Sequence, residues 1–139
     1  MLQRIQTIWL LLAAACGFLT FKYSFYSGNK PGDNQTANFE HLTATTSIII
    51  LVLTVAIVSA VVIDIFLYKN RKLQLRILLA AIIASLLNIF LYFKQTQNFV
   101  QGNYSLTSIF VFAIPVFLFL SARGIYRDQK LVKSLDRLR

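Results

Sequence analysis

Four long apolar stretches, separated by polar segments, occupy most of the chain. They cover residues 5–23, 45–68, 75–93 and 105–122. A helix needs roughly 20 apolar residues to cross a hydrocarbon core about 30 Å thick, and each stretch approaches or exceeds that length. No charged side chain occurs from Leu42 to Ile63, which in a small soluble protein would favour aggregation. The pattern predicts an all-α polytopic membrane protein, a single membrane domain whose four transmembrane helices form an antiparallel bundle.

The polar segments between the stretches differ in length and composition. Residues 24–44 contain a cluster of Gly, Asn, Pro and Asp, which favour turns, and we expect an exposed outer loop there. Residues 69–74 form a short basic turn, so the second and third spans make an antiparallel hairpin. Residues 94–104 form the second outer loop, shorter than the first.

The last segment, residues 123–139, has a different character. Ile125, Leu131, Val132, Leu135 and Leu138 fall within an arc of roughly 140° at helical spacing, which predicts a C-terminal cytoplasmic amphipathic helix. Its basic side chains are candidates for contact with anionic headgroups of the lipid bilayer or with a partner: Arg123, Arg127, Lys130, Lys133, Arg137 and Arg139. A solvated helical extension of the fourth span explains the same pattern, and the sequence leaves both interpretations open.

The basic residues are sorted by side. With four spans, eleven of the 14 Lys and Arg residues fall at the two termini and in the 69–76 region, which lie on one side of the membrane. Lys22, Lys30 and Lys94 fall on the other side. Cytoplasmic segments carry the excess of Lys and Arg, so we expect both termini in the cytoplasm. This sorting also accounts for the net charge of +9, and no motif indicates binding to nucleic acid.

Chemistry-bearing residues are scarce. Cys16 is the only cysteine and His41 the only histidine, so no cysteine metal site and no nucleophile–histidine arrangement is predicted. We expect His41 to form a surface pair with Glu40. The sequence predicts no enzyme, cofactor or metal.

Three polar residues within the apolar stretches are candidate intramembrane sites: Asp64, Ser85 and Asn88. Asp64 is the only acidic residue inside a stretch, and intramembrane carboxylates often carry function. Its position near the basic turn would let it reach the headgroups, but we favour a structural ion pair, with the candidate partners Arg71, Arg76, Arg4 and Arg123. For Asn88 we favour an interhelical hydrogen bond, with Thr54 or Ser59 as partner, over a polar lining for a substrate path.

Small residues and a proline indicate how the helices pack. Pairs at four-residue spacing, which let helices approach closely, occur in three spans: Ala13 and Gly17, Ala56 and Ala60, Ala80 and Ala84. Pro115 interrupts the fourth span, removes one helical hydrogen bond and favours a kink.

The two ends of the chain carry the most specific motifs. They read MLQRIQTIWLLLAA in residues 1–14 and ARGIYRDQKLVKSLDRLR in residues 122–139. With these motifs the whole chain resembles a bacterial family of four-span membrane proteins described as a domain of unknown function. The resemblance implies the bacterial cytoplasmic (inner) membrane, and it implies that the N-terminal segment is not cleaved at Cys16. It brings no activity and no functional residue.

These observations favour a non-enzymatic membrane scaffold or accessory subunit, working with a membrane protein partner or as a homo-oligomer. The alternative is a small oligomeric transporter or channel subunit that uses Asp64, Ser85, Asn88 and the Pro115 kink.

Overall fold

The computed structural model describes residues 2–31, 38–67 and 70–136. Along the chain lie α1 (Leu2–Lys22), β1 (Tyr26–Lys30), β2 (Asn38–Leu42), α2 (Ile48–Phe66), α3 (Arg71–Thr96), β3 (Gln101–Tyr104), a short 3₁₀ helix η1 (Leu106–Ser108) and α4 (Ile109–Asp136). All four α-helices are long and apolar enough to cross a membrane. The predicted fold, a polytopic membrane protein with a four-helix antiparallel bundle, is confirmed.

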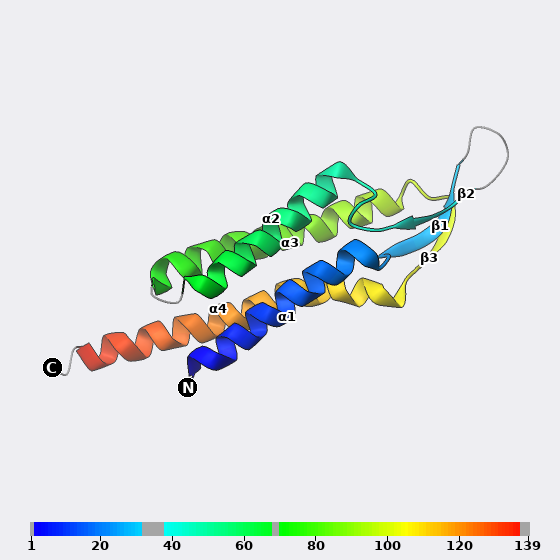
Figure 1. The fold of residues 1–139 in the computed structure, drawn as a ribbon. Coiled ribbons are helices and arrows are strands. Elements are labelled where there is room, and N and C mark those ends of the chain that lie inside the picture. The colour runs from blue at the N-terminus through cyan, green and yellow to red at the C-terminus, as the bar shows by residue number, and fades with distance from the viewer. Residues whose placement is uncertain (1, 32–37, 68–69, 137–139) are drawn as a thin grey trace.

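The four helices run side by side, and the principal contacts join α1 with α2, α2 with α3, α3 with α4, and α4 with α1. Helices α2 and α4 therefore lie diagonally across the bundle. The strands gather at one end, whereas α1 begins and α4 ends at the opposite end (Figure 1). We call these the sheet end and the terminal end.

The helices satisfy their own backbone hydrogen bonds, as the hydrocarbon core of a membrane requires. Large apolar side chains remain exposed on every helix, for example Leu11, Ile49, Ile83 and Phe119. This outward apolar surface would be unfavourable in water and is the surface that lipid covers.

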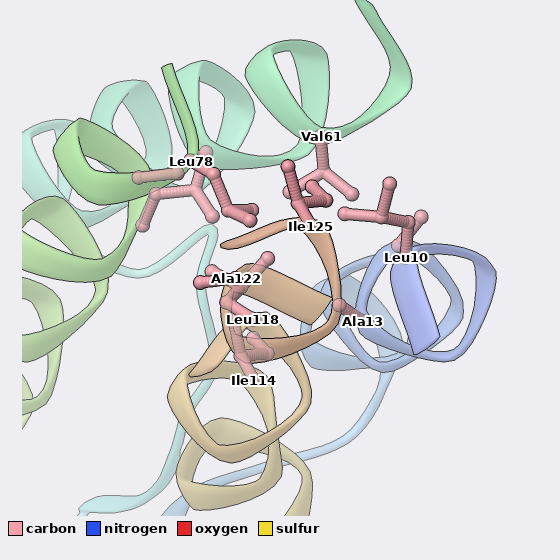
Figure 2. Close-up of a cluster of buried hydrophobic side chains, with 11 residues drawn as sticks. Leu10, Ala13, Val61, Leu78, Ile114, Leu118, Ala122 and Ile125 are labelled. Carbon is pink, nitrogen blue, oxygen red and sulfur yellow. The ribbon is translucent and has the colours of Figure 1, made fainter. Parts of the chain in front are cut away.

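The main core is built from small and branched side chains of all four helices. Leu10 comes from α1, Val61 from α2, Leu78 from α3 and Ile125 from α4. Figure 2 shows Val61 and Ile125 pointing toward one another between the helices. Because lipid is as apolar as these side chains, close packing rather than water exclusion holds the helices together.

The small pair in α1 lies at a helix contact. Ala13 is buried, and a Cβ atom added at Gly17 would lie 2.5 Å from Cγ2 of Val58 on α2. Ala60 and Ala84 pack against the edge of the main core, whereas Ala56 and Ala80 are exposed. The four-residue spacing therefore predicted one interface pair completely, Ala13 and Gly17. Of each of the other two pairs, only one member lies at an interface.

The two segments expected to be outer loops, of which the first was expected to be exposed, form a three-stranded antiparallel sheet of order β2-β1-β3. Gly28 is the residue that pairs with Glu40 of β2 and with Gly102 of β3. A Cβ atom on Gly28 would clash with the backbone oxygen of Gln101. The glycines that suggested turns therefore permit close approach of two strands.

A second core lies between the sheet and the helices. Phe25 and Leu42 are fully buried there together with Tyr92 of α3, and the Phe25 and Tyr92 rings are 4.7 Å apart. The expectation of an exposed outer loop was wrong at these positions, because local sequence does not reveal that residues 24–30 and 99–105 meet.

Helix α4 continues through Pro115 and past the expected end of the fourth span without a break. Ile125 and Asp128 are buried, so the start of the tail belongs to the bundle. The tail is thus a direct extension of α4 as far as Asp136; Arg137 and Arg139 lie outside the described residues.

The contact at Gly17 provides a test of this packing. Gly17→Leu should lower the free energy of unfolding by about 1–3 kcal/mol, because the new side chain overpacks the contact with Val58. Thermal unfolding in detergent micelles measures it. Ala15→Leu is the matched control, since Ala15 is exposed on the same helix and should leave stability nearly unchanged. Equal stability of the two variants would contradict the α1–α2 packing.

Candidate functional site

Polar side chains from all four helices are buried inside the bundle. One group, called the middle group, extends from the middle of the bundle toward the sheet end: Thr20, Thr54, Ser85 and Asn88. A second group lies toward the terminal end: Gln6, Asp64, Gln74, Ser121 and Asp128. Buried polar groups are costly without hydrogen bonds, so the partners of each group show what it can do.

Most polar side chains of the middle group form hydrogen bonds within the bundle. Asn88 Nδ2 donates to Thr54 Oγ1 at 3.1 Å, which joins α3 to α2, and Thr54 Oγ1 donates to the backbone oxygen of Ile50 at 2.7 Å. Ser85 Oγ donates to the backbone oxygen of Ile82 within α3. The expected interhelical bond of Asn88 is confirmed with Thr54. Ser59, the other partner considered, is exposed and bonds within α2.

Asp64 lies in the last turn of α2 with its side chain fully enclosed, at 0% exposure. Among the described residues, neither carboxyl oxygen has a hydrogen-bond partner. The expected ion pair is wrong for Arg71, Arg76 and Arg123, because within the described ranges the salt bridge found is Lys30–Glu40. The side chain of Arg4 lies outside those ranges.

Most of the described basic side chains at this end are exposed and form no ion pair with Asp64. Arg71 is half-buried, and the other described cations of this end are exposed: Lys72, Arg76, Arg123, Arg127 and Lys130. The exposed positions of Arg123, Arg127 and Lys130 suit contact with headgroups. The side chain of Lys133 is not described.

Members of the terminal-end group form two hydrogen bonds between helices. Gln74 Nε2 of α3 donates to the backbone oxygen of Asp64 at 3.1 Å. Gln6 Nε2 of α1 donates to Asp128 Oδ2 of α4 at 2.6 Å. A Cβ atom on Gly124 would lie 2.9 Å from Cγ of Gln6, so the glycine makes room for this glutamine. These bonds fix the backbone around Asp64 and one oxygen of Asp128.

Most buried polar atoms without a partner belong to this end of the bundle. They are both carboxyl oxygens of Asp64, Ser121 Oγ, Asp128 Oδ1 and Gln129 Nε2; Asn88 Oδ1 in the middle group is the remaining one found in the described chain. Native proteins contain few such atoms, and each calls for an explanation.

Asp64 and Asp128 both lie toward the terminal end, on helices that are diagonal in the bundle. Helices α2 and α4 both run from the sheet end to the terminal end (Figure 1). Asp64 comes three residues after Val61, and Asp128 three residues after Ile125, the two side chains that face each other in Figure 2. One helical turn beyond that contact, each helix therefore presents a buried aspartate.

Asp64 was identified as a candidate from the sequence, whereas Asp128 and Gln6 were not. Asp128 falls within residues 123–139, which were assigned as a whole to an amphipathic tail outside the bundle. Its spacing of seven from Ser121, with Ile125 between, is the helical signal that could have placed it on the buried face. Gln6 shows the same spacing with Leu10 and Ala13 in α1.

The sheet end carries a shallow hollow of about 660 Å³. Its walls come from β1, β3 and Phe39 of β2. Glu40 pairs with Lys30 rather than with His41, so the expected Glu40–His41 pair was wrong. His41 Nδ1 instead lies 3.1 Å from Ser27 Oγ. No group of three or more His, Cys, Asp and Glu side chains that could hold a metal occurs in the part of the chain that the structure describes.

Comparison with known proteins gives a family without an assigned activity. The family model described as a domain of unknown function, DUF4293, matches residues 2–138. The chain belongs to this family, as the resemblance of its terminal motifs implied. No curated protein and no solved structure matches the chain.

The Asn88–Thr54 bond can be tested with a double-mutant cycle. Asn88→Leu and Thr54→Val should each destabilise the bundle, and the double variant should lose less than the sum, with a coupling of about 0.6 kcal/mol. Unfolding in detergent measures all three. Ser59→Ala is the control, because its hydroxyl makes only a bond within α2. Strict additivity of Asn88→Leu and Thr54→Val would contradict the bond.

Proposed function

We propose that the protein is a non-enzymatic scaffold or accessory subunit of the bacterial cytoplasmic membrane, with the terminal end in the cytoplasm. The observation that supports this proposal is that the interior of the bundle and its two ends differ in character. Most side chains within the bundle pack or bond to one another, while structured, exposed surfaces gather at its two ends. A protein that binds neighbours needs such surfaces more than it needs a reactive interior.

The terminal end suits the cytoplasmic face. Its exposed cations, Arg76, Arg123, Arg127 and Lys130 among them, would lie beside anionic headgroups, where each basic residue contributes roughly 1 kcal/mol. The positive-inside rule favours the same orientation. Helix α4 is the longest of the described helices, and its extension carries Arg123, Arg127 and Lys130 toward the cytoplasm.

The sheet end suits a protein partner on the other face. Strands β2 and β3 are the edges of the sheet, and an edge strand presents backbone groups that a partner strand can pair with. Phe39 and Val100 are 64% and 70% exposed beside these edges. An apolar rim and free edges together favour a membrane protein partner or a second copy of the chain.

The non-enzymatic part of the proposal rests on the placement of the titratable groups. The lone His41 bonds to Ser27 on the sheet, far along the bundle from Asp64 and Asp128. General acid–base and nucleophilic chemistry need such groups within hydrogen-bond reach of one another and of a cleft.

A transporter subunit is the second candidate, because Asp64 is fully enclosed and has no partner in the described ranges. Ser85 and the amide nitrogen of Asn88 support it less, since both are committed to packing bonds. Reconstitution into proteoliposomes tests it. A flux that Asp64→Asn abolishes would favour transport, and a flux that persists unchanged in this variant would exclude that route.

Photo-crosslinking in native membranes tests the scaffold. A photoreactive residue at Val100 or at Lys130 should give adducts with a discrete protein partner or a second copy. The same residue at Ile83 or Phe119, both exposed on the helices, is the matched control and should label mainly lipid. Adducts equally abundant at all four positions, or none at the two ends, would contradict the scaffold proposal.

A further inference from the structure

The sheet has an outward face that is distinct from the face covering the second core. Side chains alternate between the two faces of a strand. Leu42 of β2 is buried in the second core and pairs with Tyr26 of β1, which packs against the same core. Because Tyr26 faces the helices, Ser27 and Asn29 project from the opposite, outward face.

Polar side chains meet across two strands on this outward face. Ser27 pairs directly with Asn103 of β3, and Asn29 pairs with Gln101. Residues directly opposite in an antiparallel pair project to the same side, with their Cβ atoms roughly 5 Å apart. The register of β1 and β3 therefore brings three carboxamides and one hydroxyl together.

An aromatic ring lies beside these polar groups. Phe39 of β2 pairs with Asn29 across the strands, so it shares the outward face. Its side chain is 64% exposed. The ring meets that of His41, two residues along the same strand, edge-on, with the centroids 5.1 Å apart.

The shallow hollow of about 660 Å³ lies over this patch. Five of the residues that line it are the outward-facing ones: Ser27, Asn29, Phe39, Gln101 and Asn103. None of the described residues that line it is charged. Lys30 and Glu40 bond to each other and do not line the hollow.

The carboxamides of the hollow have hydrogen-bonding capacity to spare. Within the described ranges, the side chains of Asn29, Gln101 and Asn103 form no hydrogen bond. Each carboxamide offers two donors and an acceptor. Ser27 Oγ lies within hydrogen-bond distance of His41 Nδ1, and a hydroxyl oxygen has a further lone pair. The hollow thus suits a ligand whose groups both donate and accept.

We propose that this hollow binds a neutral saccharide. Sugar hydroxyls donate and accept hydrogen bonds, as the carboxamides do. The C–H face of a sugar ring is apolar and packs well on an exposed aromatic ring such as that of Phe39. A charged ligand would find no opposite charge among the lining residues, which makes its desolvation costly.

An extended peptide fits the hollow less well than a sugar. A peptide strand is recognised mainly by its backbone, which pairs with the edge of a sheet. The free groups of the hollow are side chains on the face of the sheet. The scaffold proposal uses the edges β2 and β3, so the saccharide site does not depend on it.

Native mass spectrometry of the full chain in detergent counts bound sugar directly. A soluble oligosaccharide and a glycolipid headgroup present the same chemistry, so the experiment has an arm for each. The first arm titrates cellobiose, maltose, lactose and N,N′-diacetylchitobiose, with sialyllactose as the acidic comparator. The second titrates a neutral glucosyl-diacylglycerol against diacylglycerol without sugar. A neutral disaccharide, or the glucosyl lipid in preference to its sugar-free counterpart, should bind.

Two sets of variants locate the bound sugar. Phe39→Ala should weaken binding about fivefold or more through loss of the ring, and Phe39→Tyr should retain it. Asn29→Ala with Gln101→Ala should weaken binding about tenfold, since two hydrogen bonds are lost. Asn98→Ala is the matched control, because this exposed carboxamide of the same end does not line the hollow. Thermal unfolding checks that each variant folds, and either set alone keeps the test decisive.

Three results would overturn the proposal. The first is that none of the four disaccharides binds and the glucosyl lipid binds no better than diacylglycerol. The second is that binding survives both sets of variants unchanged, since the sugar would then lie elsewhere. The third is tighter binding of sialyllactose than of lactose, which would contradict a neutral ligand. The photo-crosslinks test the scaffold separately, so either proposal can fail while the other stands.

Discussion

The absence of water from a hydrocarbon core is the constraint on which the structure depends. Each backbone group in that region must bond within its own helix, so the chain crosses as four helices and its strands lie at one end. Polar side chains that remain inside must also find partners there. Asn88 does so through Thr54, and Gln6 through Asp128. The side chains of Asp64 and Ser121 find no partner among the described residues.

The same constraint explains which features the sequence predicts. Span number and antiparallel order follow from apolar length, because lipid requires that length of each helix. The bond between Asn88 and Thr54 also follows, since a mid-span amide has few partners to choose from. The sheet does not follow, because its strands are short and β1 pairs with a segment some 75 residues away. Pairing of that kind is decided by tertiary contact and not by local pattern.

Only part of the candidate site could be predicted from the sequence, for a related reason. Asp64 is conspicuous as an acid within an apolar stretch, but its expected ion pair assumed that nearby cations reach inward. Lys and Arg near a helix end instead extend their long side chains toward the interface, and those near Asp64 are mostly exposed. Asp128 was not recognised as a buried residue because it lies among the charged residues of the tail. The continuous helix α4 nevertheless places it on the same buried face as Ser121 and Ile125. Membership of a family of unknown function adds no constraint on either residue.

The central claim is a closed bundle whose sheet end and terminal end lie on opposite sides of the membrane. Single cysteines in a Cys16→Ala background, treated with a membrane-impermeant thiol reagent in intact and permeabilised cells, test it most directly. Gln101→Cys, exposed on β3, should react in intact cells once the reagent reaches the cytoplasmic membrane. Lys130→Cys should react only after permeabilisation, and Asp64→Cys in neither case. Reaction of Lys130→Cys before permeabilisation, or ready reaction of Asp64→Cys, would contradict the account.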